Sequence, residues 1–272
     1  MAKETMHKCR FCGGENLSRW TGDYFRCNDC LYISTVPEPS VDELNEHYKH
    51  YHEKNHQASQ QKNEQRLVSY QQEVQWLTKQ LGNPLPGKVF DYGASGGYFL
   101  DALASFGGVP TDLLNGDDAS PGAINLLKEK NYYCPIHELE DKSTSLLVLR
   151  GVLEHLLDFR GVLNQLCAAV EDAGYFFITA TPDSSGTVAN LYRDQWVQHH
   201  YPSHFQHFNS ALVDRLLAEN SFVPLAVVDL YQKSVYRSDK DDQVWLNTIN
   251  GKESGGRHAY WGSMMTRLYK KV

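Results

Sequence analysis

Four of the six cysteines fall into two closely spaced pairs near the N-terminus. Cys9 and Cys12 form the first pair, and Cys27 and Cys30 form the second after fourteen intervening residues. Two tight turns spaced in this way can present four thiolates to one tetrahedral zinc ion. A segment this short has too little apolar surface to fold without such a clamp, so we expect a zinc ribbon over residues 1–36 rather than four reduced thiols or a redox pair. Four cysteine ligands leave no open position on the ion, and the zinc would therefore be structural.

The charge and hydropathy of the whole chain exclude several classes of protein. Its 272 residues carry 26 lysines and arginines against 33 aspartates and glutamates, a formal net charge of −7. A constitutive nucleic-acid binder would show a clustered basic face, so nucleic acid is not an expected partner. No apolar run approaches the ~18 residues of a membrane span, and the N-terminus lacks the apolar centre of a signal peptide. We expect a cytoplasmic protein with no membrane partner, and the sequence does not indicate its oligomeric state.

A polar segment, residues 37–86, follows the predicted ribbon. Its first half contains four histidines: His47, His50, His52 and His56. Because no zinc-ligand spacing accompanies them, we interpret this half as a solvated helix or lid and not as a metal site. Apolar residues at spacings of three and four then predict one face of a helix, which ends near Gly82 and packs on the next domain. These residues are Leu67, Tyr70, Val74, Leu77 and Leu81.

A strand, a glycine-rich turn and a helix follow one another after this segment. Residues 88–92 predict the strand, residues 93–97 form the turn, and the helix begins at Tyr98. This order brings backbone amides and a helix N-terminus close to a nucleotide-like cofactor. A dinucleotide fingerprint would need glycine at the third and sixth positions from Gly93, where the chain has Ser95 and Tyr98, so NAD is disfavoured.

These residues resemble the first motif of the class I S-adenosylmethionine-dependent methyltransferases, in which an acidic residue precedes a glycine-rich turn. Asp91, Gly93 and Gly97 match this motif. Ser95 stands at its middle glycine and adds a Cβ near the cofactor. The resemblance implies an α/β fold for residues 87–272: a doubly wound, Rossmann-like methyltransferase sheet of seven strands, the last one antiparallel. It also implies S-adenosylmethionine as the cofactor, with the two glycines close to its methionine half and Asp91 orienting it.

Further positions match this family in order and spacing. Asp118 ends the second strand two residues before a Ser-Pro pair, where the family places a carboxylate that accepts both ribose hydroxyls, and two donors suit an acceptor-only group. Glu138 matches the exit of the third strand, where an acidic residue often faces the adenine. Residues 146–149 predict an apolar strand, residues 152–156 resemble the family's VLEH segment, and residues 174–179 resemble its fifth strand.

The C-terminal part is compatible with the reversed hairpin that closes a methyltransferase sheet. Residues 223–230 and 260–269 are predicted to be its last two strands. The polar residues 237–256 between them predict a loop. Cys134 and Cys167 are expected to be ordinary small core residues.

The ribbon supports a narrower resemblance. Residues 27–32, the prolines of residues 37–39 and an acidic helix that contains Tyr48 and Tyr51 carry it. Together they are similar to the N-terminal zinc module of bacterial methyltransferases in sugar, polysaccharide and natural-product pathways.

In the sugar C-methyltransferases of that group, a histidine-containing aromatic segment before the last large helix supplies the base. The comparable residues here are 201–210, and His204 aligns with the catalytic histidine. Ser203 stands where those enzymes carry glutamate. His155 and His207 are the alternative bases, or substrate-binding residues.

The residues and the resemblance together predict methyl transfer to a small polar acceptor. The favoured acceptor is a hydroxyl of a nucleotide-linked sugar, a glycan or a natural product, and histidine, with an ordinary pKa of ~6.5, is the natural base for a hydroxyl. A diphosphate on the acceptor would require local basic residues such as Arg150 or Arg193. Aromatic residues that suit a sugar ring, or else belong to the core, are Tyr98, Tyr192, Trp196 and Tyr201.

Two other functions are compatible with the sequence. The first is an RNA or protein methyltransferase whose zinc ribbon reads the macromolecule, and a steep salt dependence of RNA binding would indicate it. The second is a non-catalytic scaffold that binds the cofactor without turnover, which the departures at Ser95 and Ser203 raise.

Overall fold

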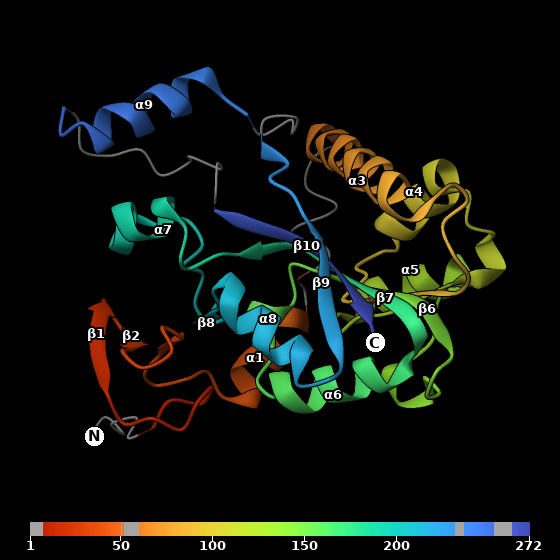
Figure 1. Ribbon diagram of the computed structural model, residues 1–272, viewed down its shortest axis with the longest axis horizontal. Helices are drawn as coiled ribbons and strands as arrows, with labels where there is room; N and C mark the ends of the chain where they lie inside the picture. The colour runs from red at the N-terminus through yellow and green to blue at the C-terminus, as the bar shows by residue number, and fades with distance from the viewer. Residues whose placement is uncertain (1–7, 50, 52–59, 232–236, 253–262) are drawn as a thin grey trace.

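The computed structural model describes residues 8–49, 51, 60–231, 237–252 and 263–272. Within them the chain forms a six-stranded sheet and a smaller four-stranded sheet. Helices cover both faces of the larger sheet, and the four-stranded sheet lies to one side of it (Figure 1).

The larger sheet has the order β5-β4-β6-β7-β10-β9. Strands β5, β4, β6 and β7 are parallel neighbours, whereas β10 is antiparallel to both β7 and β9. This order confirms the doubly wound, Rossmann-like sheet with its antiparallel last strand. The strands are β4 (Val89–Tyr92), β5 (Leu114–Asp117), β6 (Thr144–Arg150), β7 (Val170–Pro182), β9 (Phe222–Val227) and β10 (Met264–Lys271).

The expected count of seven strands is wrong by one among the described residues. Where a third strand was predicted, the chain makes only an isolated bridge between Gly116 and Tyr133 and then a 3-10 turn, η2 (Ile136–Glu138). Pro135 has no N–H to donate, and the N–H of Ile136 donates instead to Asp117 Oδ2 at 2.8 Å. Neither residue therefore has a backbone N–H available for the hydrogen bonds that would extend a third strand beside β5.

Side chains alternate along β6 and separate two apolar clusters. Leu147 and Leu149 pack in the cluster that α6 and α8 cover, whereas Leu146 and Val148 pack in the cluster that α3, α4 and α5 cover. This alternation is the period-two pattern of a strand buried on both faces. The helices are α1 (Val41–Lys49), α3 (Gln60–Leu81), α4 (Tyr98–Gly107), α5 (Pro121–Glu129), α6 (Phe159–Ala169), α7 (Thr187–Tyr192), α8 (Ser210–Ala218) and α9 (Asp239–Ile249).

Helix α9 corrects the prediction of a polar loop over residues 237–256. Ser238 caps its N-terminus, since its hydroxyl accepts the N–H of Asp241 at 3.2 Å. Acidic residues occupy the first turn, where their interaction with the helix dipole is favourable. Leu246 and Ile249 are exposed, and the helix has no buried face. The spacing of apolar residues, which predicts a helix with one buried face, therefore did not indicate it.

The four-stranded sheet joins the N-terminal segment to a distant part of the chain. It has the order β1-β2-β3-β8, and β8 (Gln206–His207) comes from the main domain. Ile33 pairs with His207, Ser34 pairs with Gln206, and the N–H of Thr35 donates to the Phe205 carbonyl at 2.8 Å. The N-terminal strands are β1 (Leu17–Thr21), β2 (Tyr24–Cys27) and β3 (Ile33–Thr35).

Helix α3 is the predicted helix of the polar segment, and it ends at Leu81 as expected. Tyr70, Val74 and Leu77 are buried, mainly against α4, whereas Leu67 is exposed. Of the four histidines of this segment, His47 lies in α1, and His50, His52 and His56 lie outside the described residues.

No helix in the described part of the chain has the length and apolarity that crossing a membrane would require.

An ion pair inside the fold fixes α3 to the main sheet. The Arg150 guanidinium at the end of β6 donates to both carboxylate oxygens of Glu73, at 2.9 and 3.2 Å, and lies 4.5 Å above the Tyr70 ring. Glu73 is buried, and the Thr179 hydroxyl also donates to it at 3.4 Å.

We therefore expect Glu73→Ala to lower the free energy of unfolding by about 3 kcal/mol, because breaking a buried pair leaves the other charge uncompensated. Denaturant unfolding followed by circular dichroism measures this change. The control is Asp172→Ala, which removes an ion pair with Lys142. Both side chains of that pair are exposed to solvent, so its loss should have a much smaller effect. Equal effects of the two variants would contradict this role of Glu73.

Candidate functional site

A cavity of about 450 Å³ opens at the carboxyl ends of β4, β5 and β6. Ligands of open α/β sheets bind at this edge, and the volume is that of a small-molecule pocket. Six residues predicted from the sequence line it: Asp91, Gly93, Ser95, Asp118, His155 and His204.

The turn after β4 requires unusual backbone geometry. Gly93 has a φ of +78°, and a Cβ at this position would lie 2.3 Å from Val152 Cγ2, so only glycine fits. Ser95 also has a positive φ, and its N–H donates to Asp118 Oδ2 at 2.8 Å. Gly97 does not line the cavity: a Cβ there would face Leu127 and Tyr132 at 3.1 Å, so its role is to begin α4 at a φ of +74°.

The carboxylate of Asp91 is the most buried acidic group of the cavity wall. Its residue is 1% exposed, and Oδ1 has no hydrogen-bond partner within the described residues. Burial raises the pKa of this carboxyl to about 7, and the nearby Arg150 guanidinium opposes the rise. A cationic group of a ligand would therefore be stabilised beside Asp91.

The two other predicted acidic residues have different positions. The Asp118 carboxylate lies at the cavity and accepts backbone N–H groups from Ser120 on Oδ1 and from Ser95 on Oδ2, both at 2.8 Å. Glu138 lies in η2 with its side chain 67% exposed, outside the cavity. The structure therefore does not bring Glu138 to the cavity with Asp91 and Asp118, because the strand that would have carried it to the sheet edge is absent from the described residues.

His155 and His204 lie together on the cavity wall, with ring centroids 4.6 Å apart. The Nδ1–H of His204 donates to the Gln198 carbonyl at 2.8 Å, which leaves the Nε2 lone pair available. His155 Nδ1 is hydrogen-bonded to the Tyr48 hydroxyl at 2.7 Å. Burial lowers the pKa of His204 to about 3 and that of His155 well below 6.5, so both imidazoles are neutral near pH 7.

Glu154 completes this group, and the sequence analysis did not select it. It is 2% exposed, Oε1 lies 3.9 Å from His155 Nε2, and Oε2 has no hydrogen-bond partner within the described part of the chain. Burial raises the pKa of its carboxyl to about 8. The sequence signal that could have identified Glu154 is its position as an acidic residue directly before a histidine in the segment 152–156.

His207 does not belong to the cavity, which corrects its selection as an alternative base. It is fully buried in β8, where its Nε2 is 3.0 Å from His199 Nδ1 and its ring lies near Tyr24 and Trp196. These contacts are with the N-terminal sheet and its neighbours, so His207 has a packing role.

The four aromatic residues predicted as a wall lie elsewhere. Tyr192 and Trp196 are core residues packed against Trp20, Tyr98 contacts the Lys130 ammonium, and Tyr201 is exposed. Four other tyrosines line the cavity: Tyr48, Tyr51, Tyr70 and Tyr92.

The two basic residues predicted to bind a diphosphate differ in their position relative to the cavity. Arg150 lines the cavity but is engaged by Glu73, and Arg193 is an exposed residue outside it.

Hydrogen bonds from the N-terminal segment, residues 8–36, fix the residues around His204. The Tyr24 hydroxyl donates to the His204 carbonyl at 2.7 Å, and the Tyr32 hydroxyl donates to Gln206 Oε1. Gln206 Nε2 in turn donates to the carbonyls of Leu153 and Leu156, at 3.1 and 2.6 Å, on both sides of Glu154 and His155. The fully buried Gln206 therefore connects the N-terminal segment to both histidines of the site.

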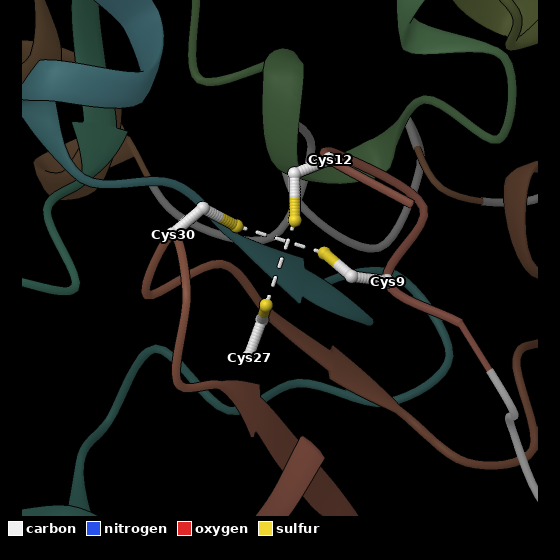
Figure 2. A group of neighbouring side chains, drawn as sticks. All are labelled: Cys9, Cys12, Cys27 and Cys30. Carbon is white, nitrogen blue, oxygen red and sulfur yellow. Dashed lines mark hydrogen bonds between the residues drawn. The ribbon is translucent and has the colours of Figure 1, made fainter. Parts of the chain in front are cut away.

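The four predicted metal-ligating cysteines converge on one point (Figure 2). The Sγ atoms of Cys9 and Cys30 are 3.6 Å apart, as are those of Cys12 and Cys27, and all four lie within 4.8 Å of one another. They are free thiols, so no disulfide accounts for the arrangement. Four sulfurs bound tetrahedrally at 2.3 Å from a zinc ion would be ~3.8 Å apart, so this group fits zinc.

Solved structures of methyltransferases share this fold. The 1,6-didemethyltoxoflavin-N1-methyltransferase of Burkholderia thailandensis, with bound 1,6-didemethyltoxoflavin and S-adenosylhomocysteine, has a TM-score of 0.54 at 13% identity, over 94% of this chain and 99% of that one. The geranyl diphosphate C-methyltransferase of Streptomyces coelicolor has a TM-score of 0.50 at 12% identity, over 74% of this chain and 78% of that one. At such identities the likeness shows the fold alone.

No curated protein matches the sequence significantly. A family model described as a methyltransferase domain matches residues 45–227, which is more than half of the chain and includes the turn after β4, the Glu154–His155 pair and His204. The chain therefore belongs to the methyltransferase domain family.

Proposed function

We propose that this protein is a class I S-adenosylmethionine-dependent methyltransferase acting on a small polar acceptor. The observation that carries the proposal is the pair of carboxylates, Asp91 and Asp118, on either side of the Gly93 turn at the carboxyl ends of β4 and β5. S-Adenosylmethionine, when bound, supplies an electrophilic methyl group on a positively charged sulfur.

The cavity wall suits the two halves of that cofactor. Asp91 Oδ1 has no hydrogen-bond partner among the described residues and would accept an N–H from the ammonium group of the methionine half. Asp118 would accept the ribose hydroxyls, and its orientation is already fixed by the N–H groups of Ser95 and Ser120. A carboxylate fixed in this way accepts its donors without first reorganising.

The proposed acceptor is a hydroxyl of a sugar-like molecule, such as a nucleotide-linked sugar, a glycan or a natural product. Tyr48, Tyr51 and Tyr70 line the cavity and suit such a molecule with their rings and hydroxyl groups, and a cavity of about 450 Å³ suits a small molecule. The formal charge of −7 also disfavours RNA as a substrate. The two structural relatives are named for small acceptors, a toxoflavin precursor and geranyl diphosphate.

His204 is the proposed base. Its Nδ1–H donates to the Gln198 carbonyl, so Nε2 is left as an acceptor, and His204 lines the cavity beside His155. Nε2 would accept the proton of the acceptor hydroxyl as that oxygen bonds to the methyl carbon and the bond between this carbon and the cofactor sulfur breaks. His155, hydrogen-bonded to Tyr48, is proposed to orient the acceptor.

Zinc is the proposed ion of Cys9, Cys12, Cys27 and Cys30. The sulfur distances of 3.6 Å suit a closed tetrahedral site, and no cysteine of the group lines the cavity. Its proposed role is therefore structural.

Asp118→Ala should weaken S-adenosylmethionine binding at least about tenfold, because hydrogen bonds to a charged acceptor contribute about 1.5–3 kcal/mol. Isothermal titration calorimetry measures this, with Glu138→Ala as the matched control that should bind like the wild type. The absence of any binding by the wild type, or equal affinities for Asp118→Ala and the wild type, would refute the cofactor pocket.

Cofactor affinity should also depend on pH through Asp91. Its raised pKa of about 7 means that the carboxyl is protonated, and unable to pair with an ammonium, at lower pH. Affinity should therefore rise by up to about tenfold per pH unit as pH increases from 5.5 towards 7. In Asp91→Asn the affinity should be weak and nearly independent of pH over that range; an unchanged pH profile in this variant would show that another group is responsible.

His204→Ala should reduce turnover about 10²- to 10⁴-fold, the usual contribution of a general base, and leave the affinity for S-adenosylmethionine unchanged. Methyl transfer from labelled cofactor to a panel of nucleotide-linked sugars measures turnover. The exposed His137→Ala serves as the control. Full turnover in His204→Ala would remove the residue from this role, and methylation of RNA or protein but of no small molecule would favour the macromolecular alternative.

A further inference from the structure

Three side chains of the cavity wall form a group of metal-ligand type outside the four cysteines. Glu154 and His155 belong to the 3-10 turn η3 (Leu153–His155), and His204 lies just before β8. One carboxylate oxygen and one ring nitrogen from each histidine all lie within 4.8 Å of one another. Two imidazoles and a carboxylate on one side of an open space are a common ligand set for divalent transition ions.

The carboxylate of Glu154 gives an independent reason to expect a cation. It is 2% exposed, and Oε2 has no hydrogen-bond partner within the described residues. A buried polar atom without a partner carries a desolvation cost that an unmet ligand can remove. Glu154 lines the same cavity as both histidines, so an ion there would contact all three side chains.

Each histidine also has an outer partner that leaves Nε2 available for an ion. The Gln198 carbonyl accepts the Nδ1–H of His204, and the Tyr48 oxygen can accept the Nδ1–H of His155. Hydrogen bonds of this kind fix the tautomer and the ring orientation of metal-ligating histidines.

We propose that Glu154, His155 and His204 bind one divalent first-row transition ion, in a second metal site distinct from the four cysteines. Imidazole ligands favour zinc, copper, iron or nickel over calcium and magnesium. Three protein ligands leave at least one position of the ion open to the cavity, where an oxygen of the acceptor can bind. The inference goes beyond the proposed methyl transfer, because binding of the ion requires neither the cofactor nor the acceptor.

The ion and a proton compete for the same lone pair on His204 Nε2. In the metal-free protein, Nε2 can act as the proposed base. In the metal-bound protein it is a ligand, and the ion lowers the pKa of an oxygen bound to it. The metal content of the active protein therefore decides whether His204 Nε2 acts as a base or as a metal ligand.

The test uses the full-length protein with zinc retained at the four cysteines and weakly held metals removed by mild chelation. Cobalt(II) is then titrated and followed by visible absorption and by calorimetry. We expect about one additional cobalt ion per chain, with ligand-field bands but without the strong thiolate-to-cobalt charge-transfer band of a cysteine site.

Glu154→Gln and His204→Ala should each weaken this cobalt binding at least about 100-fold, because each removes a direct ligand and the loss of an outer hydrogen bond alone costs about 10- to 100-fold. Tyr48→Phe should weaken it less, because it removes only an outer hydrogen bond. His137→Ala is the matched control: His137 and Glu138 form a pair with the same Nε2–Oε1 distance of 3.9 Å, but on the surface. Circular dichroism establishes that the isosteric Glu154→Gln variant is folded.

Three results would overturn the proposal: no additional cobalt, cobalt with thiolate bands only, or equal affinity in the wild type, Glu154→Gln and His204→Ala. Failure of the methyl-transfer proposal is detected separately, as an absence of S-adenosylmethionine binding. Each proposal can therefore fail while the other stands.

Discussion

The backbone pairing of β3 with β8 is the constraint on which the geometry of the site depends. It joins Ile33 and Ser34 of the N-terminal sheet to His207 and Gln206, directly after His204. The Tyr24 hydroxyl adds a hydrogen bond to the His204 carbonyl. The fold of the N-terminal strands, and an ion at the cysteines that stabilises this fold, therefore help to position His204 at the cavity, although no cysteine lines the cavity.

A second common feature of the site is a set of buried acidic groups. Asp91 and Glu154 are both buried, each has a carboxylate oxygen without an internal partner among the described residues, and burial raises the pKa of both. Such groups favour positively charged ligands. The proposed cofactor, with its ammonium and sulfonium charges, and the proposed divalent ion meet this requirement within one cavity.

The sequence predicted those parts of the fold that depend on local patterns. The apolar residues 146–149, the turn 93–97 and the helix face of Tyr70, Val74 and Leu77 all appear as expected, since neighbours along the chain determine them. The family resemblance also predicted Asp91, Asp118, His155 and His204, and all four line one cavity. The order of β5, β4 and β6 places the segments of the first three at the same sheet edge, whereas His204 comes from the segment before β8.

The features that were missed depend on distant contacts or on single hydrogen bonds. The third strand is absent from the described residues because Asp117 takes the N–H of Ile136. Trp196 packs against Trp20, far away in the chain, instead of lining the cavity. Helix α9 forms without a buried face, and Gln206 became significant only when β8 was seen to join the N-terminal sheet. None of these has a periodic signal in the sequence.

The most direct test of this account is amide hydrogen exchange before and after disruption of the four-cysteine group by Cys12→Ser, with Cys134→Ser as the control. The account predicts that residues 199–207 lose protection together with β1, β2 and β3, while α4 and β4 retain theirs. Unchanged protection of residues 199–207 in a variant whose N-terminal sheet has lost protection would show that the ribbon does not hold the site, and would contradict the account.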